Sequence, residues 1–182
     1  AAVHDSGRIG ILYGHGFHLL QSNDGSTIGE GRSTEGGFSD ILPRPGGGWV
    51  LSCRKGNLHV FNTDGRGIKR LAAGGVRRLI GWFDREHLMW QDNNGKLRCA
   101  RLANADSQRL LEDRVWSWVS RMDGGKIILQ SADGMLWEGV PHPYGWDNLE
   151  TIDTRSLEPL SAYKAGDGWW ILSIEGSVHS MS

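Results

Sequence analysis

The fold is decided by the stretch Trp49-Val50-Leu51-Ser52-Cys53-Arg54-Lys55-Gly56-Asn57-Leu58-His59-Val60-Phe61. A short apolar run stands on each side of Gly56, and a polar link ending in that glycine joins the two runs. This arrangement predicts a β-hairpin, because glycine supplies the positive φ that tight turns need.

The same hairpin pattern occurs five times along the chain. The repeat glycines are separated by 40, 39, 39 and 42 residues and are Gly16, Gly56, Gly95, Gly134 and Gly176. Weaker apolar runs before and after each hairpin predict four strands per repeat. A period of about 40 residues with four strands is typical of β-propeller blades. We therefore expect an all-β propeller of about five short blades, closed or partly open.

The repeats place the expected strands on the sequence. One propeller domain is expected over residues 1–182, with repeats at 1–37, 38–75, 76–114, 115–156 and 157–182. The first strands are expected at 1–4, 38–42, 76–83, 115–120 and 157–163, and the fourth strands at 26–29, 67–71, 107–111 and 148–152. The fifth repeat reaches only its third strand. Residues 1–6 are one candidate for the outer strand of its sheet. If they do not fill this place, the blade stays three-stranded, or the array is open and needs a partner.

Tryptophan is abundant, with nine residues in 182. Most lie on expected first and second strands, so we expect their rings to fill the space between neighbouring blades. The alternative is that they stack on sugar rings, as in a carbohydrate-binding propeller.

Composition limits the partners and cofactors. The formal net charge is −1, so a basic surface for nucleic acid is not expected, and no apolar run is long enough to predict membrane insertion. The two cysteines, Cys53 and Cys99, form no C-x-x-C pair, and the sequence predicts neither a metal site nor a cofactor. Each is expected to be a small buried residue, with a disulfide as the alternative in an oxidising compartment.

Catalytic motifs are missing from the sequence. There is no G-x-S-x-G, H-E-x-x-H or phosphate-binding glycine loop, so we expect no enzyme activity, although a pair of glycosidase carboxylates stays an open alternative.

His18, His59 and His179 follow their repeat glycines by two or three residues. That one-residue difference predicts opposite strand faces, which disfavours a ring of histidines around a metal or an anion.

One segment departs from the repeat. Residues 140–148 are longer than their counterparts and rich in proline and aromatic residues, which favours a rigid binding loop. The alternative is that the loop packs back over the edge of the sheet. The predicted partner-binding residues are His142, Tyr144, Trp146, Asp147 and Asn148. A second irregular segment, 29–37, is expected to be a solvated linker.

The stretch Asn62-Thr63-Asp64-Gly65-Arg66-Gly67-Ile68-Lys69-Arg70-Leu71 resembles the D-G-x-x-x-(+)-L ending of blades in the TolB-like bacterial propellers. Residues 104–111 match it loosely, and the W-S-P-D-G opening of that family is missing. The resemblance implies a propeller scaffold for protein contacts, often in the bacterial periplasm, and it transfers no catalytic residue.

Together these features predict a non-catalytic binding protein that recognises a protein partner. The finer prediction is an exported inhibitor or immunity-type protein of a secreted toxin or hydrolase, located in the periplasm or secreted. The sequence begins Ala1-Ala2-Val3, which fits either a mature exported form or a trimmed chain. A glycan-binding propeller is the alternative.

Overall fold

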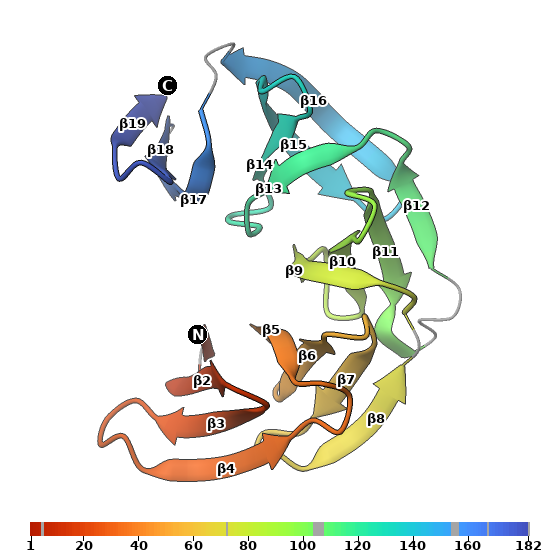
Figure 1. Ribbon diagram of the computed structural model, residues 1–182, viewed down its shortest axis with the longest axis vertical. Coiled ribbons are helices and arrows are strands. Elements are labelled where there is room, and N and C mark those ends of the chain that lie inside the picture. The colour runs from red at the N-terminus through yellow and green to blue at the C-terminus, as the bar shows by residue number, and fades with distance from the viewer. Residues whose placement is uncertain (5, 72, 104–107, 154–156, 167, 182) are drawn as a thin grey trace.

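The computed structural model describes residues 1–182 except 5, 72, 104–107, 154–156, 167 and 182. In this part of the chain, the strands form five antiparallel sheets that follow one another along an arc (Figure 1). Each sheet is one blade, and the blades are numbered 1 to 5 in chain order. This confirms the predicted all-β propeller architecture.

The strands of each blade are consecutive in sequence. Blade 1 contains β1 (Ala2–His4), β2 (Arg8–Tyr13), β3 (Gly16–Gln21) and β4 (Thr27–Arg32). Blade 2 contains β5 (Phe38–Pro43), β6 (Trp49–Cys53), β7 (Leu58–Phe61) and β8 (Gly67–Leu71). Blade 3 contains β9 (Val76–Trp82), β10 (His87–Asp92), β11 (Leu97–Arg101) and β12 (Arg109–Glu112). Blade 4 contains β13 (Trp116–Val119), β14 (Ile127–Ser131), β15 (Leu136–His142) and β16 (Gly145–Asp153). Blade 5 contains β17 (Pro159–Ala165), β18 (Gly168–Ser173) and β19 (Val178–Met181).

The N-terminal strand does not complete the last blade. β1 pairs with β2, with Val3 opposite Ile9, and so it belongs to blade 1. The expectation that residues 1–6 add to the last sheet is therefore wrong. Within the described residues, blade 5 has three strands and β19 lies at its edge.

The second strand of each inner blade is buried on both faces. In β6, Trp49 and Leu51 pack in one cluster with Phe17 of blade 1, whereas Val50 packs in another with Leu79 of blade 3. Successive side chains of a strand point to opposite faces, so a strand between two covered faces is apolar at every position. This explains the unbroken apolar runs before the repeat glycines.

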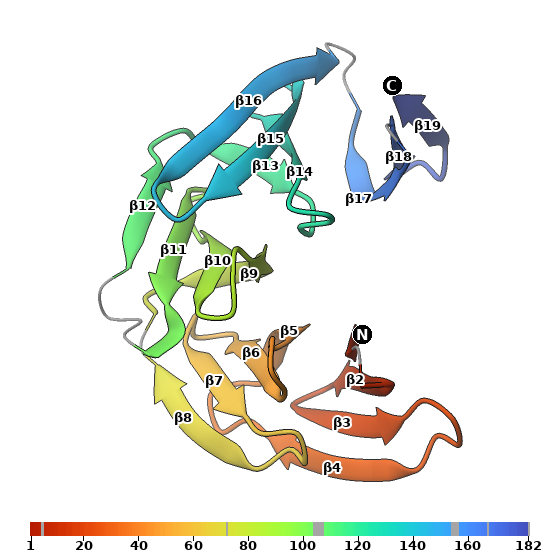
Figure 2. The same ribbon diagram turned by 180° about the vertical axis from the view of Figure 1, so that it is seen from behind.

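Four such clusters join consecutive blades: 1 to 2, 2 to 3, 3 to 4 and 4 to 5. Among the described residues, no corresponding cluster joins blade 5 to blade 1. The view from behind shows the same arc with its two end blades apart (Figure 2). The propeller described here is therefore open between its first and last blades.

The tryptophans mostly act as packing residues, as predicted. Trp49, Trp90, Trp116 and Trp169 are at most 2% exposed and belong to the clusters between blades. Trp170 differs, since 50% of its surface is exposed.

Buried glutamine side chains tie two of the blade pairs together. In blade 3, the Gln91 amide donates to the Trp116 carbonyl of blade 4 at 2.8 Å. In blade 4, the Gln130 amide donates in the same way to the Leu157 carbonyl, just before blade 5. Both glutamines lie four residues before their repeat glycine, so they occupy the same place in successive blades.

Four of the five repeat glycines have the expected backbone. Their φ angles are 79° to 88°, and they are Gly56, Gly95, Gly134 and Gly176. The prediction is wrong for Gly16, which begins β3 and pairs with Tyr13. There the turn consists of two residues, Gly14 and His15, with Gly14 at φ 46°.

The two cysteines are free and buried, so the alternative disulfide between them is not formed.

In the described residues, no helix is long and apolar enough to cross a membrane.

Candidate functional site

The segment expected to be a binding loop is a β-hairpin. His142 ends β15, Gly145 begins β16, and these two residues pair across the Pro143-Tyr144 turn. The fourth strand of blade 4 therefore starts at Gly145, three residues before its predicted start. Loop placement was wrong because the strands extend through residues that resembled an irregular connection.

The five predicted binding residues do not form one surface. Trp146 is half-buried against the cluster between blades 3 and 4, and its ring lies over Gly139, where an added Cβ would come within 2.5 Å of the ring. The other four lie toward the outside: His142 is partly exposed, with its Nε2 3.7 Å from an Asp147 carboxylate oxygen, and Asn148 donates to Glu150 at 3.2 Å. Trp146 is thus a packing residue, and the accessible part of the segment is the hairpin tip.

Tyr144 is the most prominent residue of that tip, with 78% of its surface exposed. The Arg109 guanidinium lies 5.2 Å from the centre of its ring. A cavity of about 280 Å³ adjoins both residues and is also lined by Cys99, whose Sγ donates to the Pro143 carbonyl at 3.4 Å. The tip therefore packs against the neighbouring blade 3 and leaves the Tyr144 ring exposed beside Arg109 of β12.

The outer face of blade 5 carries exposed apolar side chains. Tyr163 in β17 lies opposite Trp170 in β18, and Leu172 lies opposite Val178 in β19. Tyr163 is 67% exposed, Trp170 50% and Val178 60%. The opposite face of the same sheet packs Trp169 against blade 4. We call Tyr163, Trp170 and Val178 the end face.

The residues equivalent to Trp170 in the other blades are buried. Trp170 lies six residues before its repeat glycine, and so do Val50, Met89 and Ile128. Those three are 0% exposed because the next blade covers them. The end face therefore has the composition of a blade interface without a described blade against it.

The other end of the arc shows the same feature more weakly. Ile11 in β2 is 37% exposed, and Tyr13 is 38% exposed. The residues in the place of Ile11 in later blades, Leu51, Trp90, Leu129 and Ile171, are 0% exposed. Both ends of the array thus expose a sheet face whose counterparts are buried.

A polar cluster lies between blades 1 and 2. Glu35, in the connection from β4 to β5, accepts hydrogen bonds at Oε2 from Cys53 Sγ, Asn57 Nδ2 and His59 Nε2, each at 3.1 Å, and its Oε1 pairs with Arg70. The hydrogen bond from Cys53, followed by those from Asn57 and Arg70, lowers the pKa of Glu35 to about 2. Burial, together with the neighbouring carboxylate, raises the pKa of the Cys53 thiol. The 29–37 segment is thus a strand followed by an anchored connection, in place of the expected solvated linker.

Three histidines occupy equivalent places on their third strands, contrary to the prediction from their offsets. Opposite them in the paired strands stand Ile11, Leu51 and Ile171, each five residues before a repeat glycine. The shorter first turn removes one residue and so cancels the difference in offset. They do not form a common site, since His18 faces Glu30, His59 faces Glu35 and His179 faces Ser177.

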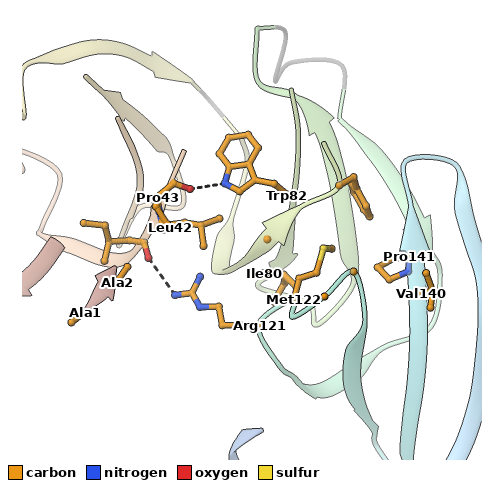
Figure 3. Close-up of a pocket in the computed structure, with 15 residues that line it drawn as sticks. Ala1, Ala2, Leu42, Pro43, Ile80, Trp82, Arg121, Met122, Val140 and Pro141 are labelled. Atoms are coloured by element: carbon orange, nitrogen blue, oxygen red, sulfur yellow. Dashed lines mark hydrogen bonds between the residues drawn. The ribbon is translucent and has the colours of Figure 1, made fainter. Parts of the chain in front are cut away.

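The largest described cavity, about 620 Å³, lies near the inner strands (Figure 3). Trp82 donates its indole N–H to the Pro43 carbonyl at 2.8 Å. Arg121 donates to the Leu79 carbonyl at 2.5 Å and pairs with Asp40, so one side chain of blade 4 ties together blades 2 and 3. The residues that line the cavity are mainly apolar, and Arg121 is their one charged member.

Comparison with solved structures places the chain among the β-propellers. The WD40 β-propeller domain of Doa1 matches with a TM-score of 0.70 and 13% identity, over 98% of this chain and 62% of that one. BamB from Moraxella catarrhalis matches with a TM-score of 0.63 and 14% identity, over 100% and 57%. A chain of the Mitotic Checkpoint Complex matches with a TM-score of 0.73 and 8% identity, over 99% and 60%.

These likenesses show the fold alone. The chain spans about three fifths of the length of these solved structures. No family model and no curated protein sequence matches it.

Sequence reasoning missed two groups of residues. Trp170 was assigned with the other tryptophans to packing between blades, although its place in the last repeat could have marked it as different. Glu35 was missed because its partners come from three separate elements, and nothing in their spacing forms a motif.

Proposed function

We propose that this chain is a non-catalytic scaffold that binds a protein partner, and that the end face of blade 5 is the main contact surface. The observation that carries the proposal is the exposure of Trp170 at a position that is fully buried in blades 2, 3 and 4. Adjacent exposed apolar side chains of this kind mark interaction sites in soluble proteins. The partner that fits is a protein presenting an apolar β-sheet face, because that is what covers the equivalent positions elsewhere in the arc.

The edge of blade 5 supports the same partner. Among the described residues, β19 is the outer strand of a three-stranded sheet, an edge that can pair with an added strand. The hairpin tip with Tyr144 and Arg109 is proposed as a second, smaller contact. Aromatic and arginine side chains are enriched among the residues that dominate binding energy.

The test is a binding measurement with a purified partner. Proteins crosslinked to the chain in its native source would be identified, purified and titrated by calorimetry against the wild type and variants. We expect Trp170→Ser to weaken binding at least about tenfold and Tyr144→Ala to weaken it less. Leu110→Ser is the matched control, since Leu110 is also exposed, at 42%, on an edge strand of blade 3. Equal affinity for the wild type and Trp170→Ser would reject the end face as the contact surface.

The finer prediction, an exported inhibitor or immunity-type protein, is tested with the same partner. If the partner is a toxin or hydrolase, adding the chain should abolish its activity, and Trp170→Ser should restore that activity. A partner without toxic or hydrolytic activity would contradict this form of the proposal.

Glycan binding has less support from the geometry. Of the nine tryptophans, all in the described part of the chain, eight are buried or half-buried and one, Trp170, is exposed. A tryptophan-fluorescence titration with sugars should stay flat if the protein-binding proposal is right.

A further inference from the structure

We propose that Glu35, Cys53 and His59 form a Zn²⁺ site that fastens the connection between blades 1 and 2 to blade 2. The three side chains offer one ligand atom each, and these atoms lie within 4.8 Å of one another. This inference is independent of the proposed protein-binding function.

The backbone explains how the three residues meet. His59 in β7 pairs with Leu51 in β6, and Cys53 lies two residues further along β6, on the same face of the sheet. Glu35 reaches this face from the connection between β4 and β5. Because the ligands come from a strand, its neighbour and a preceding connection, the usual short spacing of zinc motifs is not needed.

The distances are close to those of a tetrahedral zinc site. Cys53 Sγ and His59 Nε2 each lie 3.1 Å from Glu35 Oε2. With Zn–S bonds of about 2.3 Å and Zn–N or Zn–O bonds of about 2.0 Å, neighbouring ligand atoms are separated by roughly 3.3 to 3.6 Å. Cys53 Sγ and His59 Nε2 lie within 4.8 Å of each other, and side-chain shifts that bring all three ligand atoms to these spacings would admit the ion.

The chemistry of the donors selects zinc over the common hard cations. A thiolate and an imidazole are ligands that Zn²⁺ accepts well, whereas Mg²⁺ and Ca²⁺ prefer oxygen. Cys53 would bind as a thiolate after releasing its proton, and His59 would bind through Nε2 as a neutral imidazole. The thiolate and the carboxylate together balance the charge of the ion.

The surroundings hold the ligands in place. Cys53 is 0% exposed, and the side chains of Glu35 and His59 are 14% and 17% exposed. Arg70 pairs with Glu35 Oε1, while Oε2 faces the cysteine and the histidine and also accepts a hydrogen bond from Asn57 Nδ2 at 3.1 Å. Such outer partners orient ligating carboxylates in metal sites.

One of the three ligands, His59, borders a cavity. This cavity of about 350 Å³ is also lined by three basic side chains, Arg32, Lys69 and Arg70. Water entering from this cavity would supply the fourth ligand. The bound ion would join the connection to two strands of blade 2 and so stiffen the junction between the first two blades.

The test uses the metal itself as the probe. We expect the purified chain to bind one equivalent of Co²⁺ with a thiolate-to-metal charge-transfer band in the near ultraviolet, and Zn²⁺ to abolish this band by displacing the Co²⁺. Cys53→Ser should remove the band, and His59→Gln should weaken Zn²⁺ binding at least about tenfold in calorimetry. Zn²⁺ should raise the melting temperature of the wild type and leave that of Cys53→Ser unchanged.

Matched controls keep the result specific. Cys99→Ser removes the other buried free cysteine, and His87→Gln removes a histidine paired with Asp84 on the surface. Both variants should bind Co²⁺ like the wild type. Circular dichroism would check that Cys53→Ser is folded; if it is not, His59→Gln decides. A missing band in the wild type, a band that survives Cys53→Ser, or unchanged Zn²⁺ affinity in folded His59→Gln would overturn the site.

Discussion

The two faces of the blade 5 sheet differ in what covers them. On one face, Trp169 and Ile171 pack against blade 4 and are 2% and 0% exposed. On the other, Trp170 lies between them in sequence and is 50% exposed. The alternation of side chains in the strand is the same in blades 2, 3 and 4, where both faces are buried. Whether a residue of the second strand is buried therefore depends on the neighbouring blade. The sequence of each second strand is apolar on both faces, as a blade with two neighbours requires.

The largest effect is expected at an inner position that has no exposed surface. Trp90 is 0% exposed and packs in the cluster between blades 2 and 3. We expect Trp90→Ala to lower the free energy of unfolding by about 3–5 kcal/mol, because it removes buried surface and leaves a cavity. Urea unfolding followed by circular dichroism measures this loss. A change below about 1 kcal/mol would show that this interface does not stabilise the array.

The next prediction compares equivalent positions directly. Ile128→Ala should cost about 2–5 kcal/mol, since Ile128 is 0% exposed between blades 4 and 5. Trp170→Ala, at the same place in blade 5, should cost no more than about 0.5 kcal/mol in the isolated chain. Denaturation midpoints of both variants under identical conditions test this. Equal losses would mean that the end face is covered in solution, for example by a second copy of the chain.

Two repeat glycines, one in an inner blade and one in blade 5, allow the same comparison for the backbone. Gly56 and Gly176 have φ angles of 79° and 84°, but a Cβ on Gly56 would come within 2.4 Å of the Gly75 Cα, whereas a Cβ on Gly176 would meet nothing within 4 Å. Gly176→Ala should therefore cost about 1 kcal/mol from backbone strain alone. Gly56→Ala should cost about 3 kcal/mol, since the overlap between blades adds to the strain. Thermal unfolding of the two variants ranks them, and the reverse order would contradict the close approach of blades 2 and 3.

The smallest effect concerns two neighbouring carboxyl groups of blade 3 that differ in exposure. Burial raises the pKa of Glu112, whereas the hydrogen bond from Lys96 lowers the pKa of the exposed Asp113. A raised pKa means that the folded state holds its proton longer than the unfolded state. Glu112 therefore favours folding below its unfolded pKa, and this contribution is lost as pH rises through its folded pKa. Asp113 has the opposite sign, and its contribution is lost as pH falls.

Urea unfolding between pH 3 and pH 7, a range chosen around the usual carboxyl pKa values, measures both effects. Glu112→Gln should remove part of the fall in stability toward neutral pH. Asp113→Asn should instead reduce the loss of stability in acid. Variants with the same pH profile as the wild type would show that neither carboxyl group is coupled to folding.

The repeat could be predicted from sequence because each inner blade places apolar residues at the same distances before its repeat glycine. Glycine spacing located the hairpins and, through the shared offsets, the buried faces of β6, β10 and β14. It could not show that the turn before Gly16 is one residue shorter, because Gly14 and Gly16 both fit a turn. That ambiguity also misplaced the face of His18.

The candidate sites were harder to predict, since they depend on contacts between repeats. Proline and aromatic residues made residues 140–148 look irregular, but Trp146 packs inward over Gly139, and the strands continue almost to the turn. The cluster around Glu35 depends on side chains that meet only when blades 1 and 2 are in place. Trp170 is exposed because no blade lies against it among the described residues, and the pattern within its own repeat does not record this.

The buried amides of Gln91 and Gln130 also have a consequence for the curvature of the array. Each spans from one blade to a carbonyl of the next, and hydrogen bonds tolerate only a narrow range of donor–acceptor distances. The two hydrogen bonds therefore restrict the angles at the junctions of blades 3 and 4 and of blades 4 and 5. In blade 5 the same place is taken by Leu172, whose side chain has no amide to donate such a hydrogen bond. If the proposed partner covers the end face, a glutamine of this kind would not fix its angle to blade 5.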